Sequence, residues 1–162
     1  MSVRHVTLLE LDDVLAMEVR GAVAPSRAHV EGFPRTEDLD ALAAWERGAM
    51  GFLIVDRLGS VVGTCGTHGP VRDGALELGW GLVESARGVG VGGEAVDLLV
   101  DAVRARFPSA RVVVRTEWDV LDGIAAAVSP ASEAILERRG FLAGPAPSAK
   151  AQRNWTLSAR SS

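Results

Sequence analysis

The segment Arg87-Gly88-Val89-Gly90-Val91-Gly92, followed directly by Gly93, constrains the fold of this chain more than any other feature. It stands between a stretch with strand character, residues 75–83, and an amphipathic helical pattern over residues 91–104. Glycines at such a junction let backbone N–H groups and the positive end of a helix dipole converge on one ligand, because no bulky side chain keeps the ligand away. Arg87 adds a positive charge. The pattern therefore predicts a turn that binds a pyrophosphate.

Two other interpretations of these glycines stay open at this point. The spacing Gly88-x-Gly90-x-x-Gly93 also matches the dinucleotide fingerprint, and Glu117 is then a candidate for its ribose-binding acid. In that fingerprint the glycines follow the strand almost directly, whereas residues 84–87 intervene here, and the strands upstream lack the crossover helices of a doubly wound fold. The third interpretation is a glycine-rich turn without a ligand.

The hydrophobic periodicity predicts the element order β-α-α-β-β-β-α-β-α-β-β. Thr36 is the expected N-cap of the second helix, and Ser129-Pro130 opens the last helix, which Gly140 ends. The expected loops are 24–35 and 118–128, and the expected strands are 3–9, 52–55, 60–67, 75–83, 111–116, 141–142 and 154–157. This order is typical of an α/β (α+β) protein with a mostly antiparallel sheet and helices on both faces.

Length and charge limit the class of protein. The 162 residues suit a single domain, 1–162, and the net charge of −4 does not favour nucleic-acid binding. Cys65 is the only cysteine, and His5 and His29 have no spacing for a shared metal, so no metal site is expected. No apolar run reaches the ~20 residues that cross a bilayer, and residues 1–9 carry charges, so we expect a cytoplasmic protein without a membrane partner.

Two blocks of sequence resemble a known family. Leu76-Glu77-Leu78-Gly79-Trp80-Gly81-Leu82 followed by Ala86-Arg87-Gly88-Val89-Gly90-Val91-Gly92 resembles motif A of the GNAT N-acetyltransferase superfamily. The block Ser129-Pro130-Ala131-Ser132-Glu133-Ala134-Ile135-Leu136-Glu137-Arg138-Arg139-Gly140-Phe141 resembles the corresponding block of the branch that acetylates the N-termini of ribosomal proteins. That branch usually has asparagine where this chain has Ser129. The resemblance spans roughly residues 51–141.

The resemblance implies a GNAT fold with a six- to seven-stranded sheet that splays open between strands 75–83 and 111–116. It implies acetyl-CoA as the acyl donor, with its pantetheine arm paired to backbone near Leu82 and Val83. The cofactor-binding residues would then be Leu82, Val83, Arg87, Gly88, Val89, Gly90, Val91, Gly92, Gly93 and Ser129, the last near the thiol end. The implied acceptor is a primary amine, either a protein N-terminus or a small amine.

Amine acetylation is helped by a general base and by an acid for the leaving thiolate. Glu77 is the candidate base, because it interrupts an apolar strand and the family often has a strand glutamate here. The alternative is an outward-facing glutamate, since Leu76, Leu78 and Trp80 share the opposite parity. The chain has no tyrosine, the usual acid of the family, and the resemblance puts Ser132 in that role. A serine there can also simply bond local backbone.

The acceptor site is expected beside the segment 118–128. Trp118, Asp119 and Asp122 are the candidate acceptor-binding residues, with Gly123 as a hinge. Glu117 adds a third acidic group beside the expected acceptor mouth, and a solvated acidic loop is the alternative. His68 is either a surface residue or a base at the acceptor site. The predicted function is N-acyl transfer by direct attack in a ternary complex, and a catalytically inactive acyl-CoA-binding domain is the rival. Whether the chain works as a homodimer is left open.

Overall fold

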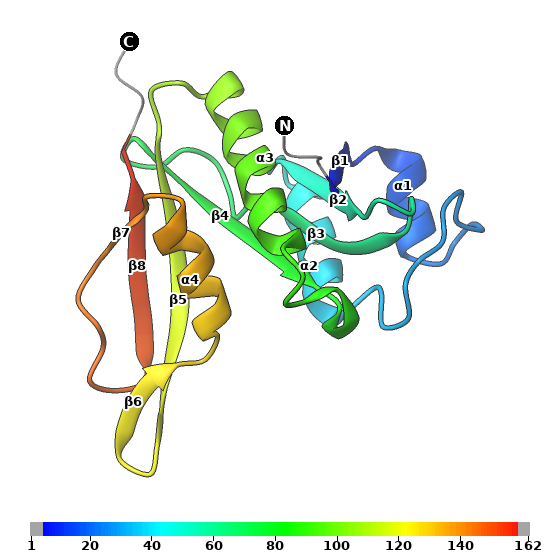
Figure 1. Cartoon of the computed structure of the whole chain (residues 1–162). Coiled ribbons are helices and arrows are strands. Elements are labelled where there is room, and N and C mark those ends of the chain that lie inside the picture. Colours follow the sequence, from blue (N-terminus) through cyan, green and yellow to red (C-terminus); the bar gives the residue numbers. More distant parts are fainter. Residues whose placement is uncertain (1–4, 159–162) are drawn as a thin grey trace.

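The computed structural model describes residues 5–158, which form one mixed sheet with helices on both faces (Figure 1). The strands are β1 Thr7–Glu10, β2 Gly51–Val55, β3 Val61–Thr67, β4 Ala75–Leu82, β5 Arg111–Leu121, β6 Ile124–Ala127, β7 Leu142–Ala143 and β8 Ala151–Leu157. The helices are α1 Asp13–Val19, α2 Thr36–Glu46, α3 Val91–Arg106 and α4 Pro130–Arg138, with a short 3₁₀ turn, η1, at Glu84–Ala86. The predicted fold class is confirmed.

The sheet opens at its centre. Its strand order is β1-β2-β3-β4-β5-β8-β7, with β6 beside β5, and every pair is antiparallel except β4 with β5. That parallel pair is only three residues long and ends at Glu77 and Val113. Beyond this point β4 continues to Leu82 and β5 to Leu121 without pairing to each other, so the predicted splay is confirmed.

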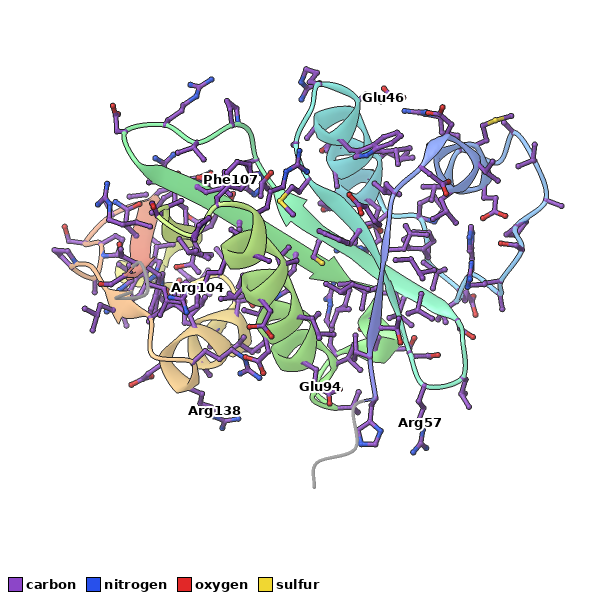
Figure 2. All side chains as sticks on the ribbon, turned by 90° about the horizontal axis from the view of Figure 1, so that it is seen from above. Glu46, Arg57, Glu94, Arg104, Phe107 and Arg138 are labelled. Atoms are coloured by element: carbon purple, nitrogen blue, oxygen red, sulfur yellow. The ribbon has the colours of Figure 1, made fainter. Side chains whose placement is uncertain are left out.

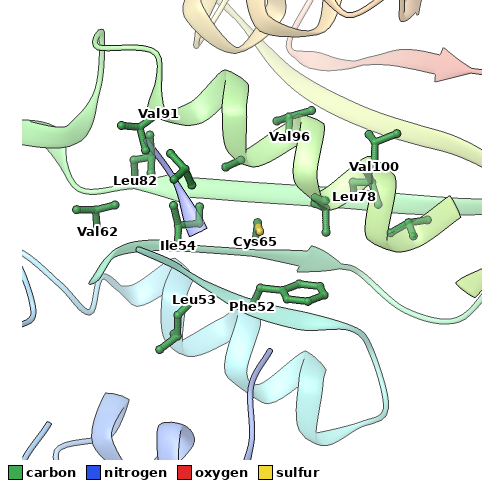
Figure 3. Packing of buried hydrophobic residues seen from close by; sticks show 14 of the residues in the cluster. Phe52, Leu53, Ile54, Val62, Cys65, Leu78, Leu82, Val91, Val96 and Val100 are labelled. Atoms are coloured by element: carbon green, nitrogen blue, oxygen red, sulfur yellow. The ribbon is translucent and has the colours of Figure 1, made fainter. Parts of the chain in front are cut away.

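The core lies between the sheet and α3. Figure 3 shows Leu78 and Leu82 of β4 facing Val96 and Val100 of α3, and all four side chains are buried. Leu53 of β2 points to the opposite face, where α2 packs against β2 and β3 (Figure 3). The sheet thus has α3 on one face and α2 on the other, and α4 packs beside α3.

Charges at both ends of α3 suit its dipole. Figure 2 shows Glu94 at the amino end of this helix and Arg104 near its carboxyl end. Acidic groups in a first turn and basic groups in a last turn each stabilise a helix. The Glu94 carboxylate also accepts a hydrogen bond from the backbone N–H of His5 at 3.2 Å. This hydrogen bond ties the amino end of α3 to the segment that precedes β1.

The segment predicted as loop 118–128 is instead the outer part of a β-hairpin. β5 runs five residues past its predicted end, and Asp122 and Gly123, with φ of 53° and 78°, form the two-residue turn into β6. Positive φ at both positions is the geometry of the hairpin turn that Asp-Gly favours. Gly123 therefore serves as a turn residue, and the sheet has eight strands rather than six or seven in the described residues.

The helix starts agree with prediction in one case and not in the other. Ser129 caps α4 and Pro130 is its first residue, as expected. The N-cap of α2 is Arg35 rather than Thr36, because the buried Asp38 carboxylate accepts the Arg35 backbone N–H at 2.8 Å and so draws the helix start back by one residue. The first strand starts at Thr7, and the expected start at Val3 lies outside the described residues. None of the helices within residues 5–158 has the length and apolar character that crossing a membrane requires.

Candidate functional site

Two left-handed glycines shape the turn before α3. Gly88 and Gly90 have φ of 76° and 87°, and no other atom would contact a side chain at either position. Glycine is required there by backbone conformation rather than by lack of space. The first hydrogen bond of α3 runs from Glu94 N–H to Gly90 C=O at 3.2 Å, so the N–H groups of Val91, Gly92 and Gly93 have no partner inside the helix. Such a helix start attracts an anion.

Gly92 and Gly93 also have a packing role that the sequence analysis did not separate from ligand binding. A side chain at Gly92 would press on Ile135 of α4, with its Cβ 3.1 Å from Cδ1, and one at Gly93 would overlap the Arg139 guanidinium. Arg139 Nε donates to the Gly93 carbonyl at 2.8 Å and also pairs with Asp97 at 2.9 Å. The missing side chains therefore let α4 dock onto the first turn of α3.

The outer part of β4 presents unpaired backbone groups to the cleft. Val83 N–H donates to Val62 C=O, and His68 N–H donates to Glu77 C=O, both at 2.9 Å. In an antiparallel pair, every second residue of a strand forms its backbone hydrogen bonds with the same neighbouring strand. The odd-numbered residues of this stretch therefore form hydrogen bonds with β3. The backbone groups of Trp80 and Leu82 point the other way, toward β5. Because β5 has already diverged, the Trp80 N–H faces the open cleft.

Leu82 and Val83 differ in what they leave free. The N–H and C=O of Val83 bond Val62 and Ala86, so the backbone pairing predicted at Val83 finds no free group there. The Leu82 carbonyl accepts a hydrogen bond from Arg87 Nε at 3.1 Å, which leaves its N–H directed at the cleft. The free positions for an extended ligand along β4 are thus Leu82 and Trp80, and Trp80 was not among the predicted site residues.

A cavity of about 670 Å³ lies between α2 and the open part of the sheet. Its volume falls in the range that is usual for small-molecule sites. It is lined by four groups of residues, from α2 and its flanks, from β3, from the outer part of β4, and from β5 with the start of α4. The lining residues include Arg35, Glu37, Asp40, Arg47, Cys65, His68, Gly79, Trp80, Gly81, Arg115, Glu117, Val128, Ser129 and Ser132.

Glu77 lies next to this cavity and is not one of its lining residues. Its side chain is 28% exposed and pairs with Arg115 of β5, with 3.4 Å between Oε1 and Nε. It sits at the last paired position of β4 and β5, on the same face of β4 as Gly79 and Gly81. The ion pair agrees with the outward-facing alternative, and the role of Glu77 as a base stays a prediction.

Ser129 and Ser132 both line the cavity. Ser129 Oγ accepts the Ser132 backbone N–H at 3.2 Å and donates to Ser132 Oγ at 2.8 Å. Since Ser132 Oγ is the acceptor in that pair, its own hydrogen remains available to donate into the cavity. The cap and the candidate acid are therefore connected in one short chain of hydroxyl groups.

Trp118 points away from the cavity toward α4. The Glu133 carboxylate accepts hydrogen bonds from Trp118 Nε1 and Thr116 Oγ1, both at 2.7 Å, and from Arg153 at 3.0 Å. Burial alone raises the pKa of this carboxyl, but these hydrogen bonds and the charge of Arg153 outweigh it and hold the pKa of Glu133 below its ordinary value. The cluster fixes the start of α4 on the sheet.

The hairpin reaches the cavity through only part of the segment expected beside the acceptor. Glu117 and Val128 line it, whereas Trp118, Asp119 and Asp122 do not. Asp119 has the same strand parity as Glu117 and therefore lies on the same face of β5, and its carboxylate accepts the Val120 N–H at 2.8 Å. Asp122 is in the turn at the hairpin tip. Both stay candidates for contact with the outer part of an acceptor.

Two alternating glycines in β4 mark a part of the site that the sequence analysis missed. A side chain at Gly81 would overlap the Arg35 guanidinium, and one at Gly79 would overlap the ring of His68. Arg35 is held by bonds to both Asp38 carboxylate oxygens, and Thr64 donates to the same carboxylate. Glycines on one face of a strand signal a close approach on that face.

Cys65 also lines the cavity, but burial raises the pKa of its thiol far above the ordinary value, so it is no nucleophile.

Known proteins share this architecture. The family model described as an acetyltransferase (GNAT) domain matches residues 2–142. An acetyltransferase from Agrobacterium tumefaciens is similar at 21% identity and a TM-score of 0.59, over 97% of this chain and 92% of that one. The ribosomal-protein-S5-alanine acetyltransferase from Vibrio fischeri is 15% identical, with a TM-score of 0.58 over 96% and 93% of the two chains. RimL, a ribosomal L7/L12 α-N-protein acetyltransferase in complex with coenzyme A, is 15% identical, with a TM-score of 0.61 over 96% and 95%. No curated protein sequence matches this chain significantly.

Proposed function

The chain belongs to the GNAT acetyltransferase family, and we propose that it transfers an acetyl group from acetyl-CoA to a primary amine by direct attack. The observation that carries this proposal is the cleft between β4 and β5, which runs from the amino end of α3 to a cavity large enough for a thioester and an amine. The family uses acetyl-CoA, and the features of the cleft fit that donor as follows.

The turn before α3 fits the pyrophosphate. The N–H groups at the start of α3 are free of intrahelical bonds, and the left-handed Gly88 and Gly90 keep the approach open. Val89 and Val91 belong to this turn through their backbone, and Arg87 is close enough to move its guanidinium from the Leu82 carbonyl to a phosphate. Along β4, the Leu82 N–H and the Trp80 backbone groups would pair with the pantetheine arm.

The Trp80 N–H would also stabilise the charge that develops on the thioester oxygen during attack. Backbone donors that are already fixed in place act strongly in a site that excludes water, because they need no reorganisation. Trp80 is held in place because β4 is paired to β3 at this position, and its indole lies close to Gly92. Ser132 would donate its hydroxyl hydrogen to the leaving thiolate, in the absence of a tyrosine from the chain.

The sequence predicts Glu77 as the group that takes the proton from the amine. Because it lies beside the cavity and not in its lining, it would have to act through a water molecule. Its ion pair with Arg115 would have to loosen for that purpose.

The acceptor would reach the thioester from the α2 side. Of the charged residues in the cavity lining, Arg35 is paired with Asp38 and Arg115 with Glu77, which leaves Arg47 against the three carboxylates of Glu37, Asp40 and Glu117. A surplus of acidic groups favours an amine that arrives as a cation. Two structural neighbours are ribosomal-protein acetyltransferases, and this supports a protein N-terminus as acceptor, with a small amine as the second candidate.

Coenzyme A release in the presence of a panel of N-terminal peptides and small amines tests the proposal, with mass spectrometry to detect the acetylated product. We expect at least one acceptor to gain one acetyl group at its amine. If acetyl-CoA binds but no amine of the panel is acetylated, the chain is the catalytically inactive acyl-CoA-binding domain.

A further inference from the structure

His68 occupies a position in the cavity that its sequence context did not reveal. It follows β3 directly, and its backbone N–H donates to Glu77 C=O at 2.9 Å, which fixes the residue beside the point where β4 and β5 separate. A Cβ at Gly79 would overlap the ring, and Nε2 is the ring atom closest to it. The Nε2 edge of the imidazole therefore lies against Gly79, one residue before Trp80, on the α2 side of the sheet.

Among the described residues, His68 is the only histidine that lines the cavity, and histidine is the side chain that most often serves as a general base. The titratable and charged groups that face the same cavity are carboxylates, guanidiniums and one buried thiol. They come from α2 and its flanks, from β3 and from β5, and they are Arg35, Glu37, Asp40, Arg47, Cys65, Arg115 and Glu117. Glu77 of β4 lies next to the cavity and is paired with Arg115.

We propose that His68 is the general base of the reaction and accepts the proton of the attacking amine on Nε2. The proposal rests on the acetyl transfer proposed above. An amine that arrives as a cation first loses one proton to water. In the step, the nitrogen of the resulting neutral amine forms a bond to the thioester carbon and the carbon–sulfur bond breaks. The nitrogen loses its proton to Nε2, and the sulfur leaves with the bonding electrons and takes a proton from Ser132, which regains one from water. The His68 ring lies against Gly79, the residue before Trp80 in β4, so the Trp80 N–H would serve the oxygen and the His68 ring beside it the nitrogen.

Three variants test this role with the acceptor that the panel identifies. His68→Gln should lower kcat by about 10² to 10⁴, the usual contribution of a general base, with the KM for acetyl-CoA unchanged. The acid limb of the pH–rate profile should disappear together with the imidazole. His68→Ala should recover activity when imidazole is added to the buffer, which a structural role would not produce. His5→Gln is the matched control, because His5 is exposed and outside the cavity, and it should behave like the wild type.

Gly79→Ala provides an independent check, since its Cβ pushes the ring away while the imidazole is kept. We expect it to lower kcat and to leave the thermal stabilisation by acetyl-CoA in place. An unchanged turnover rate and pH profile in His68→Gln, with an active wild type, would overturn the role of His68 alone. A wild-type chain that binds acetyl-CoA and acetylates no amine would overturn the proposed function instead, and the base with it.

Discussion

The two ends of the cleft are built from different parts of the chain. At the amino end of α3 the ligand would meet backbone: free N–H groups, two left-handed glycines and one arginine. On the α2 side the cavity is lined by side chains that come from four separate segments, with His68, Glu117 and Arg35 among them. The first end is local in sequence, and the second is assembled only when the sheet forms.

This difference teaches where specificity can vary in such a fold. Backbone groups recognise the part of a ligand that stays constant, because changing a side chain in the turn moves few of them. The acceptor end can change with single substitutions, since each lining side chain contributes its own charge and shape. Helix α4 connects the two, because Ser129 and Ser132 line the cavity while Ile135 and Arg139 pack on the first turn of α3.

The largest effect is expected from Gly90→Glu, which tests the backbone-built end. Acetyl-CoA at about a hundred times its Kd should stabilise the wild type by ~2.7 kcal/mol, or roughly 5–10 °C in Tm. A carboxylate at this helix start repels the pyrophosphate, so the variant should show no shift at the same concentration.

Gly59→Glu is the matched control for that experiment. Gly59 is also left-handed, with φ of 82° and open space around it, but it lies in the turn between β2 and β3. It should lose a similar amount of intrinsic stability and keep the shift with acetyl-CoA. Stabilisation by NADH in place of acetyl-CoA would restore the dinucleotide interpretation of these glycines.

The second-largest effect is expected from Glu133→Gln, which tests how α4, the helix that connects the two ends of the cleft, is held in place. The change weakens three hydrogen bonds to a buried charge, and we expect a loss of about 2 kcal/mol, or roughly 4–8 °C in Tm. The pKa of Glu133 in the folded protein lies below its ordinary value of 4.5. The carboxylate therefore contributes its full stabilisation of the fold above pH 4.5, and this stabilisation is lost as the pH falls toward the folded pKa.

The Tm difference between wild type and Glu133→Gln should therefore be largest near neutral pH and shrink in acid. Glu137→Gln, an exposed change on the same helix, should cause no comparable loss. Equal Tm values for wild type and Glu133→Gln at neutral pH would contradict the role of this cluster.

The sequence predicted most of the fold and the glycine turn before α3 because both depend on short-range patterns. Apolar periodicity gave the helices and strands, and the glycine spacing with Ser129-Pro130 marked two helix starts. The hairpin was missed although Asp122-Gly123 between apolar residues is a strong turn signal, because the segment was interpreted as a long loop.

The acceptor end of the site was harder to predict from the sequence, for a physical reason. His68 and Gly79 are brought together by the register of β3 with β4, and Arg35 reaches Gly81 only through the docking of α2 on the sheet. Neither contact produces a periodic sequence pattern from which it could be predicted. The parity of Glu77 against Leu76 and Leu78 did indicate its outward face, and the ion pair with Arg115 agrees with it.

A smaller effect is expected at the acceptor end of the cleft from replacing the acidic residues of the β5–β6 hairpin. Replacing Asp119 and Asp122 together with Asn should raise the KM for a cationic amine by roughly tenfold or less, because exposed charges contribute under ~1 kcal/mol each. The salt dependence of that KM should flatten, and the KM for acetyl-CoA should stay the same. Glu117→Gln should have at least as large an effect, since Glu117 lines the cavity directly. If neither variant changes the amine kinetics, the hairpin does not contribute to acceptor binding.

The smallest effect is expected from Glu77→Gln, and it decides which group at this end handles the proton. If Glu77 were the base, kcat would fall by about 10²-fold and the acid limb of the pH–rate profile would shift. Because its carboxylate is paired with Arg115 and stands outside the cavity lining, we expect only the loss of a partly exposed ion pair. That loss is worth under ~1 kcal/mol, or about fivefold at most in rate. Measuring Glu77→Gln and His68→Gln side by side with the same amine separates the two. A large drop in the first and none in the second would return the base to Glu77 and make His68 a residue that only packs against Gly79.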